Sequence, residues 1–193
     1  LEHGRAVMRG VLAQEIHHRV KNNLQAVASL LRLQARSEHV DPRRALQDSV
    51  NRILAIAAVH EVLTEHREDD VDLGELIERL RAMIVQGLGS GKVVEARLTS
   101  VSLAGQRATA LALVFTELLQ NALEHGGERV TIELAGREGG EVCLAIADDG
   151  PGIDGRPEGT GLSIVRALVR DELRGELALR DGPGLRAEVV FPA

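Results

Sequence analysis

The sequence predicts two folding units in series: a hairpin of two long helices, followed by an α/β sandwich. Two observations lead to this fold class, α + α/β. Over the first 70 residues, apolar side chains recur at helical spacing with almost no Gly or Pro. Beyond them, short apolar runs bounded by Gly-rich turns alternate with helical segments, as in a sheet covered by helices. The acidic polar segment at 67–72 marks the change, and the expected units are 1–70 and 71–193.

The first unit is expected to be an antiparallel helical hairpin. Its first helix covers 7–36, where apolar residues recur at helical spacing without Pro. After a turn at Asp41-Pro42, where Asp can cap and Pro takes the first helical position, the second helix runs to about His66. Two helices with one apolar stripe each cannot enclose a core, so we expect pairing with a second copy into a four-helix bundle. The alternative is a monomer in which the second unit covers the hairpin. The expected stripe of the second helix is Leu46, Val50, Ile53 and Ala57.

The second unit is expected to combine three helices with strands that form one sheet. A turn at Gly139-Gly140 joins two of the strands as a hairpin, and a Gly-rich loop at 150–161 leads into the last helix. The expected helices are 73–86, 106–125 and 162–173, and the expected strands are 92–103 (one or two), 129–135, 141–147, 176–180 and 186–191.

The composition argues against several function classes. The net charge is -6 with dispersed basic residues, and the aromatic residues are Phe115 and Phe191 alone, so neither nucleic acid nor an anionic membrane is an expected partner. The single cysteine, Cys143, permits no disulfide framework within one chain, which fits the cytoplasm. No apolar run approaches the roughly 20 residues that span a bilayer. The chain begins without Met, which indicates a piece of a longer protein with a sensor portion upstream.

His18 is the first residue with distinctive chemistry. At roughly 100° per residue, Ile16, Val20 and Leu24 lie near one line, the expected buried seam of the first helix. His18 then points roughly 160° away from the seam, whereas His17 lies at about 60° from it. An exposed imidazole offers the nucleophilic nitrogen that a transferable phosphoryl group requires. The simpler alternative is a surface histidine that only adds solubility.

The helix expected at 106–125 carries a second polar pair. Glu117 and Asn121 are four residues apart and therefore share one face of this helix. An amide oxygen is a hard, neutral ligand suited to Mg²⁺, and a carboxylate beside it can polarise a nucleophile. On its own, such a pair usually belongs to a solvated helix face.

Two Gly-rich segments complete the candidate set. Asp148 follows an apolar strand, where a carboxylate can accept a hydrogen bond from the exocyclic amine of adenine. Gly150 and Gly152 come next and permit a close approach of the backbone. The segment at 159–162 opens a helix and so presents free backbone N–H groups to phosphate. An ordinary turn is the alternative for each segment.

In this order and spacing, the four segments resemble the sensor histidine kinases. The resemblance is to the HisKA_2 or HWE-like group, whose acceptor box reads H-R-V-K-N-N-L-Q, and it extends from about residue 10 to 191. Residues 12–36 match the acceptor box and 116–125 the N box. Residues 148–153 match the G1 box and 159–165 the G2 box.

The resemblance implies a Bergerat (GHKL) fold for the second unit, with ATP and Mg²⁺ as ligands. His18 would be the phosphoacceptor, Asn121 would bind Mg²⁺, and Glu117 would lie beside the γ-phosphate. Asp148 would contact adenine. The implied enzyme is a protein-histidine kinase that autophosphorylates and then passes the phosphoryl group to an aspartate of a response regulator receiver domain. The implied residues of the nucleotide pocket and its lid are Gly150, Gly152, Gly159, Thr160, Gly161 and Leu162.

Two departures from the larger histidine-kinase family bear on the mechanism. Most members carry an acid directly after the acceptor histidine, where this chain has Arg19. Glu117 is therefore our candidate base, with Glu15 as a local alternative. The segment 153–158 between the G1 and G2 boxes is short and has no aromatic residue, so a small lid is expected.

Two other function classes remain open alternatives. One is a GHKL ATPase of the gyrase or chaperone kind, in which ATP closes a dimer clamp; the acceptor hairpin argues against it. The other is a scaffold that binds nucleotide and transfers nothing. The complete set of Glu117, Asn121 and Asp148 argues against this second alternative.

Overall fold

The structure is a computed structural model, and it describes residues 42–66, 70–88, 91–152 and 159–193 together with Gln25, Ala28 and Arg32. The expected first helix at 7–36, with His18 and its seam, therefore lies outside the described residues. By the contacts among its residues the chain divides into two compact units, 1–49 and 50–193. The functional division at residue 70 stays a prediction.

Helix α2 (Pro42–His66) begins at Pro42 and has the expected length. Its last 17 positions, 50–66, belong to the second unit. The expected apolar stripe is exposed: 68% of Leu46, 40% of Val50 and 46% of Ile53 are accessible. The buried positions of α2 lie on another face: Ser49, Arg52, Ala55, Ile56, Ala58, Val59 and Val62.

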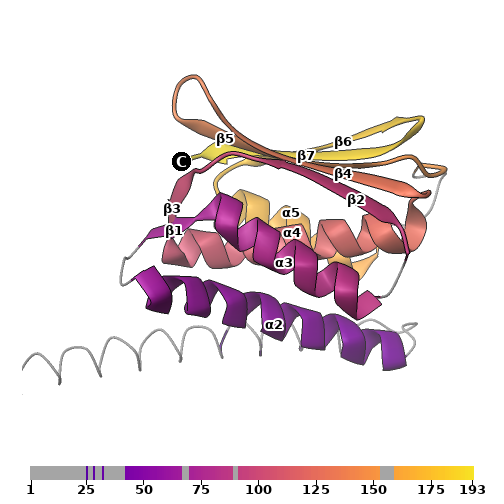
Figure 1. Cartoon of the computed structure of the whole chain (residues 1–193), viewed down its shortest axis with the longest axis horizontal. Coiled ribbons are helices and arrows are strands. Elements are labelled where there is room, and N and C mark those ends of the chain that lie inside the picture. Colours follow the sequence, from indigo (N-terminus) through magenta and orange to yellow (C-terminus); the bar gives the residue numbers. More distant parts are fainter. Residues whose placement is uncertain are drawn as a thin grey trace, which may run out of the picture. The chain divides into compact units, whose positions relative to one another are not determined.

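The second unit contains a five-stranded sheet with the strand order β2-β4-β5-β7-β6 (Figure 1). Strands β2 and β4 pair in parallel, and the other neighbours are antiparallel. The strands expected at 129–135, 141–147, 176–180 and 186–191 are confirmed with slightly longer bounds, whereas the region expected at 92–103 holds the shorter β2 and most of β3 (Ser102–Ala104). These bounds are β2 Val93–Leu98, β4 Arg129–Arg137, β5 Glu141–Asp148, β6 Glu176–Gly182 and β7 Gly184–Pro192.

Three helices cover one face of this sheet: α3 (Leu73–Leu88), α4 (Gly105–His125) and α5 (Thr160–Asp171) (Figure 1). Along β4, buried Val130, Ile132 and Leu134 alternate with more exposed residues, because only one face of the sheet is packed. Helix α4 is buried on nearly every side. A helix enclosed in this way holds its few polar side chains in fixed positions.

Strand β1, which pairs with β3, was not expected from the sequence. Segment 67–72 reads as an acidic linker, yet β1 (Asp70–Asp72) pairs antiparallel with β3 (Ser102–Ala104). The pairing buries Val71, which lies opposite Leu103. Asp72 then caps α3, since its Oδ1 accepts a hydrogen bond from the Glu75 backbone N–H at 3.0 Å. One buried valine between acidic residues was too weak a signal for a strand.

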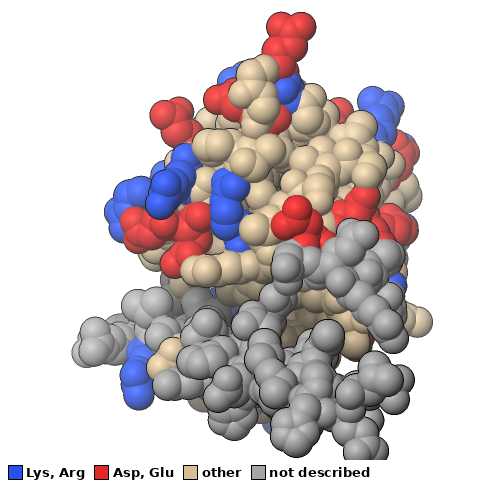
Figure 2. All heavy atoms as spheres, turned by 90° about the vertical axis from the view of Figure 1, so that its left-hand side faces the viewer, with Lys and Arg blue, Asp and Glu red and all other residues tan. Residues whose placement is uncertain are grey.

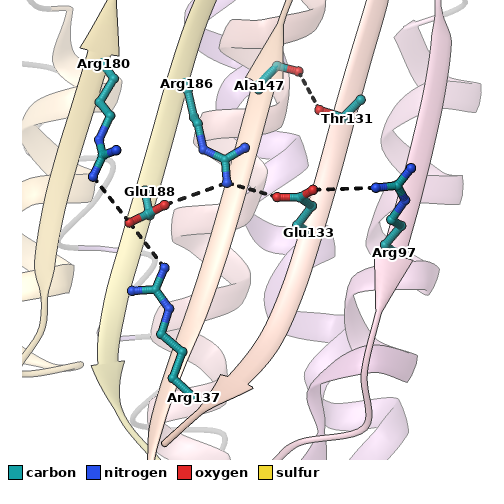
Figure 3. Close-up of polar contacts among 8 residues, drawn as sticks. All are labelled: Arg97, Thr131, Glu133, Arg137, Ala147, Arg180, Arg186 and Glu188. Atoms are coloured by element: carbon teal, nitrogen blue, oxygen red, sulfur yellow. Dashed lines mark hydrogen bonds and ion pairs between the residues drawn. The ribbon is translucent and has the colours of Figure 1, made fainter.

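The sheet face away from the helices carries a ladder of ion pairs across the strands (Figure 3). Glu133 on β4 accepts a hydrogen bond from Arg186 on β7 at 2.9 Å. Glu188 on β7 lies 3.4 Å from Arg137 and 3.9 Å from Arg180, and only 12% of its side chain is exposed. Under this ladder burial raises the pKa of the Cys143 thiol, and the charge of Glu188 adds to the effect. A buried thiol with a raised pKa forms little of the reactive thiolate at neutral pH.

Replacing Glu188 by Ala should lower the free energy of unfolding by about 1 kcal/mol, because three arginines lose their shared acceptor. The loss should shrink in 1 M salt, which screens the remaining charges. Urea denaturation at low and high salt measures both effects. Glu141→Ala, at an exposed position of β5, is the control and should change little. Equal losses for the two variants would contradict a role of the ladder.

Candidate functional site

The buried helix α4 carries the polar pair expected in the N box. Glu117 is almost fully buried, with 5% exposure, and Asn121 lies half-buried one turn later. Within the described residues, the Asn121 side chain makes no hydrogen bond, so its amide oxygen is available to a ligand. Mg²⁺ takes oxygen ligands and commonly uses one or two protein groups together with substrate phosphates. This side chain fits that requirement.

The Asp148 carboxylate organises the turn at the end of β5. Its Oδ1 accepts hydrogen bonds from the backbone N–H groups of Gly150 at 2.8 Å and Leu185 at 3.4 Å. These bonds join the turn after β5 to the start of β7. The described residues provide no hydrogen-bond partner for the other oxygen, Oδ2, which leaves it free to accept from an adenine amine. Asp149 joins the same turn to the start of β4, because its Oδ1 accepts a hydrogen bond from the Arg129 backbone N–H at 2.9 Å.

Glycines bring the end of α4 into direct contact with this turn. A Cβ on Gly126 would lie 2.6 Å from the Asp148 Cβ, and a Cβ on Gly150 would lie 2.6 Å from the Gly126 Cα. Lys92 secures the approach, because its Nζ donates to the Gly126 carbonyl at 2.9 Å. The N box and the G1 box therefore meet through backbone that no larger residue could occupy.

The start of α5 approaches the other end of the polar pair. A Cβ on Gly161 would lie 2.6 Å from Oε2 of Glu117, so the G2 glycine passes directly over that carboxylate. Gly159 has open space around it, and Leu162 is half-buried at the first turn of α5. Gly152 adopts a φ of +78°, and a Cβ there would lie 2.0 Å from Oδ1 of Asp181. Thr160 begins the helix, and the structure does not describe its side chain.

Glu117 also has a partner that the sequence did not reveal. Arg52, on helix α2, donates from Nε to Oε1 at 2.5 Å and from Nη2 to Oε2 at 3.0 Å. The exposed fractions of the two side chains are only 4% and 6%. This bidentate ion pair links α2 to the N-box helix inside the second unit.

The structure thus brings together the expected residues of three segments, the N box, the G1 box and the start of the G2 box. His18 and the lid segment 153–158 lie outside the described residues. Sequence reasoning missed Gly126, Arg52 and also Gly184, whose backbone packs against the Asp148 carbonyl. Two glycines in a row directly after a helix could have indicated the close approach at Gly126, whereas a single Arg within a helical pattern carried no signal.

Asp148→Asn should weaken ATP binding by about tenfold and leave the affinity for inorganic triphosphate nearly unchanged. The reason is that Oδ2 would face adenine in the expected site, while the phosphates would lie elsewhere. Calorimetric titration with both ligands makes the comparison. Equal losses for both ligands would show that Asp148 only shapes the turn. Asp149→Asn, which alters the neighbouring carboxylate, is the matched control and should affect neither ligand selectively.

Two family descriptions match most of the chain. The family described as "Histidine kinase" matches residues 15–88, and the family described as "Histidine kinase-, DNA gyrase B-, and HSP90-like ATPase" matches residues 106–193. Among the described residues, no helix has the length and apolar character that would take it across a membrane.

Curated relatives and solved structures agree with these matches. "Sensor histidine kinase PdtaS" of Mycobacterium tuberculosis is 38% identical over 200 residues, which cover 96% of this chain and 40% of that protein. The protein of the same name from Mycolicibacterium smegmatis is 39% identical, covering 92% of this chain and 38% of its own length. This chain therefore spans about two fifths of these relatives.

A solved histidine kinase domain from the Erythrobacter litoralis EL346 blue-light activated histidine kinase has the same fold. It superposes with a TM-score of 0.74 at 23% identity, covering 93% of this chain and 89% of the other. This likeness shows the fold, and the family matches and the PdtaS relatives show the family. The chain belongs to the sensor histidine kinases, with a HisKA_2 or HWE-like acceptor segment and a GHKL ATP-binding fold.

Proposed function

We propose that this chain is the catalytic core of a two-component sensor histidine kinase that phosphorylates His18 with Mg·ATP. The observation that carries the proposal is the convergence of Glu117, Asn121 and Asp148 with the Gly161 backbone around one end of α4. Asn121 would hold Mg²⁺, and Asp148 would hold adenine through Oδ2. The α5 N-terminus would donate backbone N–H groups to the phosphates.

In the proposed transfer an imidazole nitrogen of His18 attacks the γ-phosphorus in line. A nitrogen–phosphorus bond forms, the bond between the γ-phosphorus and the bridging oxygen breaks, and ADP leaves with that electron pair. The proton displaced from the imidazole passes to the Glu117 carboxylate, since Arg19 takes the place of the usual neighbouring acid. Bound Mg²⁺ would neutralise the charge that develops on the phosphate oxygens.

The phosphohistidine would then donate its phosphoryl group to an aspartate of a response regulator receiver domain. We expect a cytoplasmic homodimer, because ATP is supplied there and the apolar stripe of α2 is exposed on a single chain. A second hairpin of the same sequence would cover that stripe in a four-helix bundle. The sensor domain would lie outside this chain, which fits the partial coverage of the relatives.

One incubation tests the proposal against its rivals. The purified chain is mixed with γ-labelled ATP and Mg²⁺, and the labelled protein is exposed to acid and to alkali. Phosphohistidine should be lost in acid and kept in alkali, and addition of a cognate receiver domain should remove the label. Phosphate release without labelled protein would indicate a GHKL ATPase, and nucleotide binding without either product would indicate a scaffold.

A further inference from the structure

The ion pair between Arg52 and Glu117 lies where the proposed reaction needs a free carboxylate. Both Glu117 oxygens accept hydrogen bonds from the same guanidinium, at 2.5 and 3.0 Å. The Gly161 backbone closes the site next to Oε2. With 5% exposure, Glu117 has almost no surface left for an incoming imidazole. In this arrangement the carboxylate cannot reach the proton of an acceptor histidine.

The guanidinium comes from helix α2, which follows the acceptor segment in the same chain. Arg52 lies on the buried face of α2 together with Ala55, Ile56 and Val59, so the contact depends on how this helix lies on the N-box helix. Movement of α2 would withdraw Arg52 and expose Glu117. A buried ion pair adds little net stability to the fold, but breaking it is costly, so it favours the position of α2 in which the pair is formed. Such a preference for one of two helix positions is what a conformational switch requires.

A second buried polar group beside the ion pair lacks a hydrogen-bond partner in this arrangement of the helices. Gln120, one turn from Glu117, is 4% exposed, and its Nε2 has no hydrogen-bond partner among the described residues. A buried donor without an acceptor raises the free energy of the conformation that holds it. This cost favours a different arrangement of α2 and α4 when a stimulus or a nucleotide stabilises that arrangement.

We propose that Arg52 is an autoinhibitory contact: it withholds Glu117 from His18 until α2 moves. The inference rests on the proposed kinase function, since it assigns the control of the same carboxylate. Arg52 here acts through Glu117 and takes no part in the transfer. Signals that reach α2 would then set the fraction of molecules with an available base, as in a two-state switch.

The test compares the initial rates of acid-labile labelling at saturating Mg·ATP. Arg52→Gln removes the charge that holds Glu117 and should raise the rate by about fivefold or more, within the range common for coupled sites. Arg52→Lys keeps the charge but loses the bidentate geometry, and it should give a smaller rise. Glu61→Gln, at an exposed position of the same helix within the second unit, should match the wild type. Adding Glu117→Gln to Arg52→Gln should return labelling to background.

ADP affinity and hydrogen exchange separate this effect from simple unfolding. Arg52→Gln should keep ADP affinity within about twofold and exchange faster in residues 50–66 than the wild type does. If the Arg52→Gln protein fails to bind ADP, the labelling rate of the Arg52→Lys protein is compared with that of the wild type instead. Folded variants that label at the wild-type rate or slower would overturn the autoinhibitory role and leave the kinase function intact. Wild-type protein that binds ADP but never becomes labelled would overturn both proposals.

Discussion

Asn121→Ala is expected to lower the labelling rate by at least about 100-fold and to remove the Mg²⁺ dependence of ATP binding. The change deletes the amide oxygen that we assign to Mg²⁺, and Mg²⁺ tolerates incomplete coordination poorly. The fold should survive, because Asn121 is half-buried and its side chain bonds to no described residue. Titration of ATP with and without Mg²⁺, alongside the labelling rate, measures the effect.

Asn121→Asp is the matched control, since it keeps an oxygen ligand at the same place and should retain part of the Mg²⁺-dependent binding. Thermal unfolding of both variants checks that the helix is intact. Unchanged Mg·ATP affinity in Asn121→Ala would remove this residue from the metal site and leave Asp148 and the glycine contacts as the remaining support for nucleotide binding.

Gly184→Ala is expected to cost about 3 kcal/mol of unfolding free energy or more and to weaken ATP binding severely. Gly184 has a φ of +134°, and a Cβ there would lie 1.8 Å from the Asp148 carbonyl oxygen. The added methyl group would force apart the start of β7 and the end of β5. Asp148 would then lose the hydrogen bond that its Oδ1 accepts from Leu185.

Gly182→Ala, two residues earlier, is the control for that experiment. A Cβ at Gly182 meets no atom within 4 Å, so this variant should unfold within about 0.5 kcal/mol of the wild type. Urea denaturation and ATP titration of both proteins provide the comparison. Similar unfolding free energies and ATP affinities of the two variants would show that the backbone around Gly184 and Asp148 can shift to admit a methyl group at no cost.

The helices and strands of the second unit were predictable because their signals are local. Alternation along β4 follows directly from burial of one face, and the long apolar run of α4 without an internal Gly or Pro follows from its burial on nearly every side. Strand β1 was missed because its stability comes from one buried valine and a partner about 30 residues away. The buried face of α2 could not be predicted either, since Arg52 is buried only through its pairing with the distant Glu117.

The candidate site was predictable to the extent that its chemistry lies in short motifs. Glu117, Asn121, Asp148 and the flanking glycines stand in segments whose order and spacing are typical of the family. The contacts between these segments were not predictable, because they depend on backbone approach. Gly126 against Asp148 is such a contact, and the tertiary fold alone brings the two together.

His18 is the proposed acceptor of the phosphoryl group, and labelling of two single variants tests this role. His18→Gln should lose all acid-labile label while binding ATP normally. His17→Gln should become labelled at a reduced but measurable rate, because helical spacing turns His17 toward the flank of the expected seam. Labelled His18→Gln protein together with unlabelled His17→Gln protein would contradict the claim and reverse the expected orientation of the first helix.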